Sequence, residues 1–362
     1  MIVMGGTARD GAGGVASVIA TYAAHGLFQR WPVVTLASHV VGNKWQKLAA
    51  FLKALLQYVV LFVRGRVELV HLHSSAGPSF WRKTCFALPA FACRKPVILH
   101  LHSGLFMTFY EQDCGPAGSI RRRVVRFVFE RSKLVIALAP SWRERYLSIA
   151  PRANIVCIPN AVRVSGGAPR GLEQHKQRNV LFLGRISADT GVFDLIEAWV
   201  DVRRRVSNAR LVIAGDGDLA RARACIARAG LEDSVALPGW VSGAAKEQLL
   251  ERTQVCVLPS YFEGMPMSLL EAFGHGIPCV ASTAGGIPDV VTDGVEGRLV
   301  QAGDVPALAV ALVELLSDGE QYARMSRAAH ARYTSACSVD VVIPALEKVY
   351  AELGIKANPV SG

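Results

Sequence analysis

Short apolar runs recur along the first half of the chain, and longer stretches with helical spacing of apolar residues separate them. The runs predict buried strands, and the stretches between them predict helices. Strands that are apolar on both faces and joined by helices are typical of a parallel sheet covered on both sides. The predicted strands are Ile2 to Met4, Val33 to Ala37, Leu69 to Leu72, Val97 to His102, Leu134 to Leu138 and Ile155 to Ile158.

A polar segment, SGGAPRGLEQHKQR from Ser165 to Arg178, then interrupts this alternation and has the composition of a linker. Strands and helices alternate again from Val180 onward, and 362 residues are too many for one ordinary core. We therefore predict an α/β fold of two doubly wound Rossmann-like domains facing a central cleft. The predicted parts are a first domain (1–165), a linker (166–178), a second domain (179–336) and a C-terminal helix (337–362) packing back on the first domain.

The most apolar stretch is LAAFLKALLQYVVLFV, from Leu48 to Val63. It is shorter than the roughly 20 apolar residues needed to span a bilayer, and it contains Lys53 and Gln57. We expect a helix packed on the sheet; a helix lying in a membrane interface is the alternative. The first residues lack the basic and apolar regions of a signal peptide, so none is expected.

The chain is basic, with 40 Lys and Arg against 29 Asp and Glu, a net charge of +11. Its 51% of hydrophobic residues excludes a disordered protein. The charge favours an anionic partner: a nucleotide diphosphate, a nucleic acid or an acidic membrane surface. The stretch Arg121 to Arg131 predicts a basic amphipathic helix, which could dock on anionic lipid together with the apolar stretch. No nucleic-acid reading module is recognisable, so no nucleic-acid partner is expected.

The eight cysteines include no C-x-x-C pair, which is typical of a reduced cytosolic protein without a zinc site. Asp216 and Asp218 form a D-x-D sequence, but a tight turn between a strand and a helix commonly uses these residue types. We expect no metal site there.

The segment from Tyr261 to Val291 holds the strongest candidate chemistry. Glu263 lies in a turn rich in glycine and proline, and a helix is predicted from Pro266 to His275, with Gly276 as its C-cap. Glu271 lies in the second turn of that helix. The N–H groups at its start, from Gly264 to Met267, would carry partial positive charge and suit a phosphate. Two carboxylates beside a phosphate site can accept sugar hydroxyls, so the segment favours a sugar nucleotide.

The two glutamates could instead be a glycosidase pair. A retaining pair lies about 5–5.5 Å apart, whereas eight residues of mostly helical chain suggest roughly 8–12 Å. An inverting pair is not excluded by distance, but a helix N-terminus between the acids favours a phosphate.

Three further candidates lie at strand ends or helix starts. Arg185 follows the predicted strand ending at Leu183, and its planar guanidinium group can grip a diphosphate. Gly13 and Gly14 precede a helix, where backbone N–H groups can approach a phosphate. His102 ends a strand, much as His73 ends the preceding one.

Several phrases in the sequence resemble the retaining glycosyltransferases of family 4, which have the GT-B fold. The resemblance extends to the bacterial enzymes of exopolysaccharide and lipopolysaccharide assembly. It implies that Glu263 contacts the donor sugar, Glu271 the ribose and Arg185 the diphosphate, and that His102 lies near the reacting carbon. The phrases are IPNAV (158–162), FLGRIS (182–187), LVIAGDG (211–217), LPGWVS (237–242), PSYFEGMPMSLLEAFGHGIPCVAS (259–282) and GGIPDVV (285–291).

The sequence departs from the family at one position. The family usually has lysine five residues after the arginine, where this chain has Thr190, so a cation beside the leaving diphosphate is lost. The predicted catalytic residues are Glu263, Arg185 and His102. The predicted donor-binding residues are Gly13, Gly14, Thr190, Gly264, Met265, Pro266, Met267, Ser268, Leu269 and Glu271.

The resemblance implies transfer of a sugar, with retained configuration, from a nucleotide-sugar donor to a hydroxyl group. GDP-mannose is the first expectation for the donor, then UDP-glucose or UDP-N-acetylglucosamine. The expected acceptor is a polyprenyl-diphosphate-linked or other oligosaccharide, at the cytoplasmic face of the plasma membrane, and no metal or other cofactor is expected. Two other functions stay open: a nucleotide-sugar epimerase and a non-catalytic nucleotide-sugar-binding subunit. The replacement of the family lysine by Thr190 favours the second of them.

Overall fold

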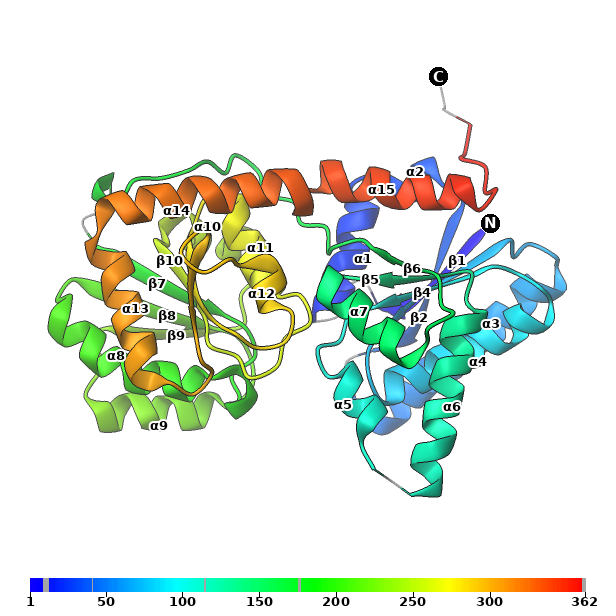
Figure 1. Ribbon diagram of the computed structural model, residues 1–362, viewed down its shortest axis with the longest axis horizontal. Helices are drawn as coiled ribbons and strands as arrows, with labels where there is room; N and C mark the ends of the chain where they lie inside the picture. The colour runs from blue at the N-terminus through cyan, green and yellow to red at the C-terminus, as the bar shows by residue number, and fades with distance from the viewer. Residues whose placement is uncertain (9–12, 41, 114, 175–176, 360–362) are drawn as a thin grey trace. The chain divides into compact units, whose positions relative to one another are not determined.

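The computed structural model describes residues 1–8, 13–40, 42–113, 115–174 and 177–359. The chain forms two compact units (Figure 1). The first unit contains Met1–Ala161 together with the segment from Val339 onward, and the second contains Val162–Ser338. The last helix, α15 (Val339–Glu352), therefore belongs to the first unit although it follows the second along the chain.

The first unit is built on a parallel six-stranded sheet with the order β2-β1-β3-β4-β5-β6. The predicted α/β class and the predicted strands are confirmed, with ends that differ by one to three residues. His73 pairs with His100 across β3 and β4, so histidines of the two strands meet on one face. The strands are β1 (Ile2–Thr7), β2 (Val33–His39), β3 (Leu69–Ser74), β4 (Val97–Leu101), β5 (Leu134–Ala137) and β6 (Ile155–Cys157).

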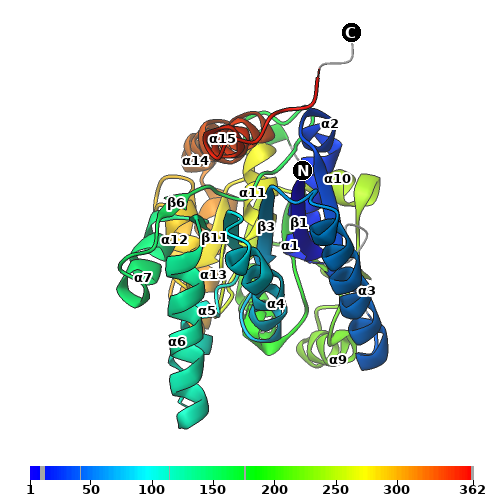
Figure 2. The ribbon, with the colours of Figure 1, turned by 90° about the vertical axis from the view of Figure 1, so that its right-hand side faces the viewer.

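Helices cover both faces of this sheet. Right-handed crossovers place α3, α4 and α6 on one face, where they lie side by side (Figure 2). On the other face, α1 and α15 pack against the histidines, and Tyr350 Oη of α15 lies 2.7 Å from His71 Nδ1. Besides α15, the helices are α1 (Gly14–Ala24), α2 (Leu27–Arg30), α3 (Lys44–Val63), α4 (Pro78–Ala92), α5 (Phe106–Glu111), α6 (Pro116–Arg131) and α7 (Pro140–Ile149).

Helix α3 differs from its prediction in length and in burial. A capping box between Asn43 and Gln46 starts the helix earlier than the apolar stretch alone predicts. Tyr58 Oη donates to the Phe86 carbonyl of α4 at 2.7 Å, which ties the inner side of α3 to the unit. Helix α3 packs on β2, as predicted, but only Ala54 and Tyr58 of its 20 residues are buried, so most of its surface is left uncovered by the described residues.

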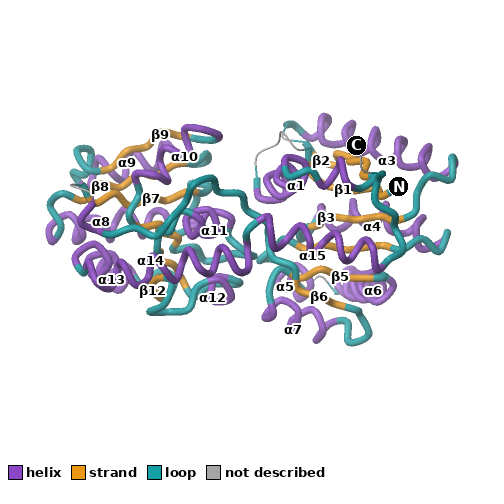
Figure 3. Tube along the Cα trace, turned by 90° about the horizontal axis from the view of Figure 1, so that it is seen from above, coloured by secondary structure: helices purple, strands orange, loops and turns teal. Residues whose placement is uncertain are grey.

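The second unit contains another parallel sheet, with the order β12-β11-β10-β7-β8-β9 (Figure 3). Its strands are β7 (Arg178–Leu183), β8 (Ala209–Ala214), β9 (Val235–Gly239), β10 (Val255–Leu258), β11 (Cys279–Ser282) and β12 (Gly297–Val300). Its α-helices are α8 (Val192–Arg205), α9 (Leu219–Ala229), α10 (Gly243–Arg252), α11 (Met267–Gly274), α12 (Ile287–Val290), α13 (Val305–Ser317) and α14 (Gly319–Arg332).

Three short helices complete the description of the second unit. Two are 3₁₀ turns, Leu172–Gln174 and Ala188–Thr190, and one is a π turn, Tyr333–Cys337, at the end of α14.

The segment predicted as a linker, 166–178, packs on the second unit instead. Arg170 donates through its backbone N–H to Ser326 Oγ at 2.8 Å, and its guanidinium group bonds the Glu251 carbonyl. His330 Nε2 lies 3.0 Å from the Gly167 carbonyl. Arg178 already belongs to β7. Apart from residues 175 and 176, which lie outside the described residues, the segment is part of the unit that it precedes.

Candidate functional site

Glu263 lies in the loop after β10, at the carboxyl end of a central strand of the second sheet. Ser260 Oγ donates to its Oε1 at 3.1 Å, and Gly286 N–H donates to its carbonyl at 3.0 Å. Gly285 has φ +58°, and a Cβ there would collide with the Glu263 carbonyl. The Gly285-Gly286 pair therefore permits a close approach that fixes the backbone of Glu263.

The Glu263 carboxyl group is half-buried, and its pKa is raised to about 7. Burial causes the shift because it disfavours the charged form, while the hydrogen bond from Ser260 opposes it. The carboxyl group can therefore gain or lose a proton near neutral pH. A group with such a pKa is suited to accept a hydrogen bond from a sugar hydroxyl or to hold a proton.

This raised pKa predicts a pH-dependent effect of Glu263→Gln on stability. The folded protein binds the proton of the Glu263 carboxyl group more tightly than the unfolded chain does. The protonated carboxyl group therefore contributes its full stabilisation below about pH 4, and this stabilisation is lost as pH rises through 7. We expect the glutamine variant to gain roughly 1–2 kcal/mol over wild type between pH 5 and pH 8, after solvent screening. Thermal unfolding midpoints at both pH values measure this; parallel pH profiles of the two proteins would contradict it.

The helix after Glu263 begins one residue later than predicted. Pro266 has φ −73° and ψ 113°, an extended conformation, and is the N-cap of α11 rather than its first residue. At the other end His275 is the C-cap, and Gly276 follows it with φ +66°. The predicted end of this helix was therefore one residue too late.

The start of α11 has the free backbone N–H groups that the predicted anion site requires. The N–H groups of Met267, Ser268 and Leu269 have no carbonyl partner within the helix, as in any first helical turn. They carry the positive end of the helix dipole. The predicted residues Gly264 and Met265 lie in the loop between Glu263 and this turn.

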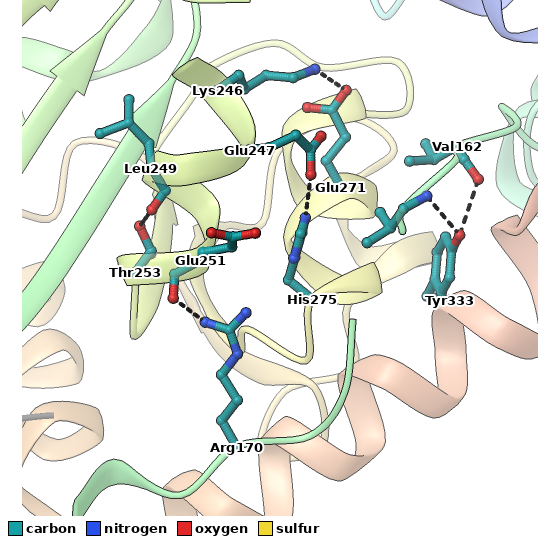
Figure 4. Close-up of polar contacts among 11 residues, drawn as sticks. Val162, Arg170, Lys246, Glu247, Leu249, Glu251, Thr253, Glu271, His275 and Tyr333 are labelled. Carbon is teal, nitrogen blue, oxygen red and sulfur yellow. Dashed lines mark hydrogen bonds and ion pairs between the residues drawn. The ribbon is translucent and has the colours of Figure 1, made fainter. Parts of the chain in front are cut away.

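Glu271 lies in α11 and accepts a hydrogen bond from Lys246 Nζ of α10 at 2.7 Å (Figure 4). Burial raises the pKa of Glu271, and Lys246 opposes this shift. Both side chains are largely shielded from solvent, with 26% exposure for Lys246 and 14% for Glu271. Lys246 therefore favours the charged form of the carboxylate and orients it. Sequence analysis did not assign this lysine because it lies 25 residues away on another helix.

For the nucleotide-sugar donor that the sequence predicts, we expect Lys246→Met to raise the KM about five- to tenfold and to change kcat less. Without the lysine, the buried carboxyl of Glu271 loses its partner, its pKa rises further, and it becomes a poorer acceptor for the ribose hydroxyls that it is predicted to bind. Donor saturation curves measure the effect. Lys348→Met is the matched control, because it removes a lysine from an exposed pair with Glu352. Equal KM values for both variants would contradict the role of Lys246.

Arg185 is exposed directly after β7, next to β10 in the sheet. Its loop is joined to the Glu263 loop, because Tyr261 N–H donates to the Asp189 carbonyl at 2.9 Å. Gly191 has φ +66°, and a Cβ there would collide with the Pro259 carbonyl. The structure therefore brings the loops of Arg185 and Glu263 together at the carboxyl ends of two neighbouring strands.

Thr190 is bonded within its own loop. Its hydroxyl donates to the Arg185 carbonyl at 2.7 Å and lies 2.9 Å from the Ser187 carbonyl. The threonine thus orders the turn that carries Arg185. To donate to a phosphate, as predicted, this hydroxyl would have to break its hydrogen bond with the Arg185 carbonyl.

The D-x-D sequence, Asp216 to Asp218, lies in the turn between β8 and α9. The Asp216 carbonyl accepts from Ile186 N–H at 2.6 Å, and the Asp218 side chain caps α9 by accepting from Arg221 N–H at 3.1 Å. Gly217 has φ +118°, and a Cβ there would collide with the Ile186 carbonyl. The turn therefore supports the Arg185 loop.

In the first unit, Gly13 is the N-cap of α1 with φ +116°, and Gly14 is the first residue of that helix. The conformation of Gly13 is one that residues with a side chain rarely adopt. Both glycines lie at the positive end of α1, as a phosphate contact requires. Residues 9–12 of the same loop lie outside the described residues.

His102 follows β4, and both of its ring nitrogens have partners. Nδ1 lies 3.1 Å from Asn160 Oδ1, and Nε2 lies 2.9 Å from His73 Nδ1. An amide oxygen only accepts, so the assigned tautomer carries its proton on Nδ1 and accepts from His73 at Nε2. Burial lowers the pKa of His102 to about 4, so the ring is neutral at pH 7. Asn160 belongs to the IPNAV phrase, but the sequence alone gave no reason to pair it with His102.

The buried rings of His71, His73 and His100 form a cluster next to His102. One ring nitrogen of each histidine lies within 4.8 Å of a ring nitrogen of each of the other two, which is close enough for the three to share a metal ion. Burial lowers the pKa of His71 to about 3 and that of His73 and His100 well below the usual value. The other histidines lower these pKa values further, and Lys83 acts on His73 in the same direction. This environment disfavours added positive charge, so we assign no metal to the cluster.

Comparison with known families identifies the chain. Residues 12–165 match the model described as Glycosyltransferase Family 4, and residues 177–318 match the model described as Glycosyl transferases group 1. The chain therefore belongs to the family 4 glycosyltransferases, and its two Rossmann-like units are those of the GT-B fold.

Curated relatives include alpha-D-kanosaminyltransferase of Streptomyces kanamyceticus, 32% identical over 49% of this chain and 46% of the relative. Another is the amylovoran biosynthesis glycosyltransferase AmsK of Erwinia amylovora, 29% identical over 53% of this chain and 49% of the relative. The chain spans about half the length of these relatives.

A solved structure with the same fold is HepE of Anabaena in complex with UDP-glucose. It is 17% identical and covers 97% of this chain and 99% of its own, with a TM-score of 0.74. At this identity the likeness supports the fold alone.

Proposed function

We propose that the protein transfers a sugar from a nucleoside-diphosphate donor to an acceptor hydroxyl with retained configuration, in cell-surface polysaccharide biosynthesis. The arrangement of two carboxylates around the start of α11 carries this proposal. Glu263 is held by Ser260 before the helix, and Glu271 is held by Lys246 within it. The family membership of the chain supports the same class of reaction.

The diphosphate of the donor would lie against the first turn of α11 and against Arg185. Negative charge grows on the diphosphate as its bond to the sugar breaks, and these fixed positive groups stabilise it. Glu271 would accept hydrogen bonds from the ribose, and Glu263 from the sugar. The departing phosphate oxygen would help remove the acceptor proton on the same face of the sugar, so no covalent enzyme nucleophile is required. The contact of His102 with the sugar stays a prediction from the family resemblance.

The acceptor in this proposal is a polyprenyl-diphosphate-linked or other oligosaccharide. The protein would act at the cytoplasmic face of the membrane. GDP-mannose, UDP-glucose and UDP-N-acetylglucosamine are the donors to test, and HepE, which was solved with UDP-glucose, supports including that one.

Incubation of the purified protein with labelled forms of these donors, with and without a bacterial membrane extract, tests the proposal. We expect release of the nucleoside diphosphate that depends on the extract, together with label in a lipid-soluble product. Conversion of the free donor into another sugar nucleotide would instead indicate an epimerase. Binding without turnover would indicate a non-catalytic subunit, in line with Thr190 in place of the family lysine.

A further inference from the structure

The apolar stripe on the outer side of α3 has no partner within the described part of the chain. It consists of side chains that are each 46–83% exposed: Trp45, Leu48, Leu52, Leu56, Val59 and Val63. Their spacing of three or four residues places them on one side along the whole helix. We call this stripe the α3 ridge.

The α3 ridge lies opposite the side by which α3 packs on its own unit. The buried residue Ala54 is two positions from both Leu52 and Leu56, a rotation of about 200° around the helix. Helix α3 is therefore apolar on two opposite sides, and only one of them is covered. An exposed apolar stripe of this length marks a surface that another apolar body covers.

Basic residues accompany the ridge without any acidic residue. From residue 44 to residue 66 the chain contains Lys44, Lys47, Lys53, Arg64 and Arg66 and no Asp or Glu. Lys44 and Lys53 are exposed, and by helical spacing they lie on either side of the ridge. Helix α6, which lies beyond α4 on the same face of the sheet, is basic as well and exposes Ile120 and Phe127.

An apolar ridge with basic flanks indicates which kind of partner covers it. A symmetric contact between two copies would require a self-complementary surface, but the basic flanks of one ridge would meet those of the other. An anionic bilayer supplies both an apolar interior and negative headgroups, and Trp45 is of the residue type that prefers the boundary between them. We propose that the α3 ridge docks on an anionic lipid bilayer, with α3 lying in the plane of the membrane.

By length and composition, α3 is the one helix of the described residues that could cross a membrane, but its contacts argue against that orientation. Tyr58 Oη is bonded to the Phe86 carbonyl, and α3 packs along β2, so its inner side belongs to the first unit. Crossing the bilayer would expose this side to lipid and break these contacts. Docking in the plane leaves them intact and would hold the first unit at the surface where a lipid-linked acceptor lies.

Vesicle flotation of the full chain tests the inference with lipid alone. We expect binding to phosphatidylcholine vesicles that contain about 30 mol% phosphatidylglycerol and weak binding to phosphatidylcholine vesicles. Leu52→Gln/Leu56→Gln and Lys44→Glu/Lys53→Glu should each weaken binding at least about tenfold, because they remove apolar contact and charge attraction respectively. Both pairs are exposed, so the thermal unfolding midpoint should stay unchanged.

Arg223→Glu/Arg327→Glu is the matched control, because it makes the same change in net charge on exposed helices of the second unit. This variant should float with the vesicles like wild type. Equal flotation of all four proteins, or no flotation of wild type, would overturn the inference, as would a concentration-dependent dimer that the leucine substitutions abolish.

The inference deepens the proposed function only through the lipid-linked acceptor. Turnover of the donor with a water-soluble acceptor, unchanged in the α3 variants, would show that the proposed transfer stands even if docking fails.

Discussion

Glu263→Gln is expected to lower kcat for sugar transfer by about 10²- to 10³-fold, with a smaller change in the KM for the donor. The substitution keeps the shape of the side chain and can keep the hydrogen bond from Ser260 Oγ, but it removes the negative charge and the ability to hold a proton. In the proposed mechanism both matter most in the transition state, when positive charge develops on the sugar ring. Initial rates of nucleoside diphosphate release measure the effect.

Glu197→Gln is the control for this variant, because it makes the same chemical change at an exposed position of α8. It should retain wild-type rates. If the Glu263 variant also retained them, Glu263 would not take part in the reaction.

Arg185→Ala is expected to lower kcat/KM by about 10²- to 10³-fold. The guanidinium group would neutralise charge on the departing diphosphate, and Thr190 adds no charge five residues later. In the proposed mechanism, more of this stabilisation therefore falls to Arg185 than it would if a lysine stood at position 190. Arg185→Lys should restore only part of the activity, because an ammonium group keeps the charge but loses the planar fork.

Donor binding and thermal unfolding of both Arg185 variants serve as controls. Arg185 is exposed, so the alanine variant should unfold at the wild-type temperature. Wild-type kcat/KM in the alanine variant would remove Arg185 from the proposed mechanism.

The sequence predicts most of the architecture because buried parallel strands are continuous apolar runs. All six strands of the first sheet could be located in this way. β12 was missed because Gly297–Val300 is a short run with an arginine inside it. The predicted linker was wrong because its polar composition does not reveal backbone bonds such as that from Arg170 to Ser326.

Helix α3 shows a different limit of sequence reasoning. The apolar stretch predicted a helix, but periodicity could not show which side the protein covers, because apolar residues occupy both sides. Only the structure shows that Ala54 and Tyr58 face inward while Trp45 and Val63 face outward.

At the candidate site, the sequence could predict the residues that follow one another in a single loop and helix, such as Glu263 and Glu271. It could not predict partners that tertiary folding brings in from elsewhere. Lys246 reaches Glu271 from α10, and Asn160 reaches His102 from the loop after β6. Thr190 was expected to approach a phosphate, but the structure shows its hydroxyl bonded to the Arg185 carbonyl.

A crystal structure of the protein with a bound nucleoside diphosphate, either UDP or GDP, tests the central claim most directly. We expect phosphate oxygens within hydrogen-bonding distance of the N–H groups of Met267 to Leu269 and of the Arg185 guanidinium group, with the ribose on Glu271. A nucleotide bound elsewhere, with no phosphate at the start of α11, would contradict the account.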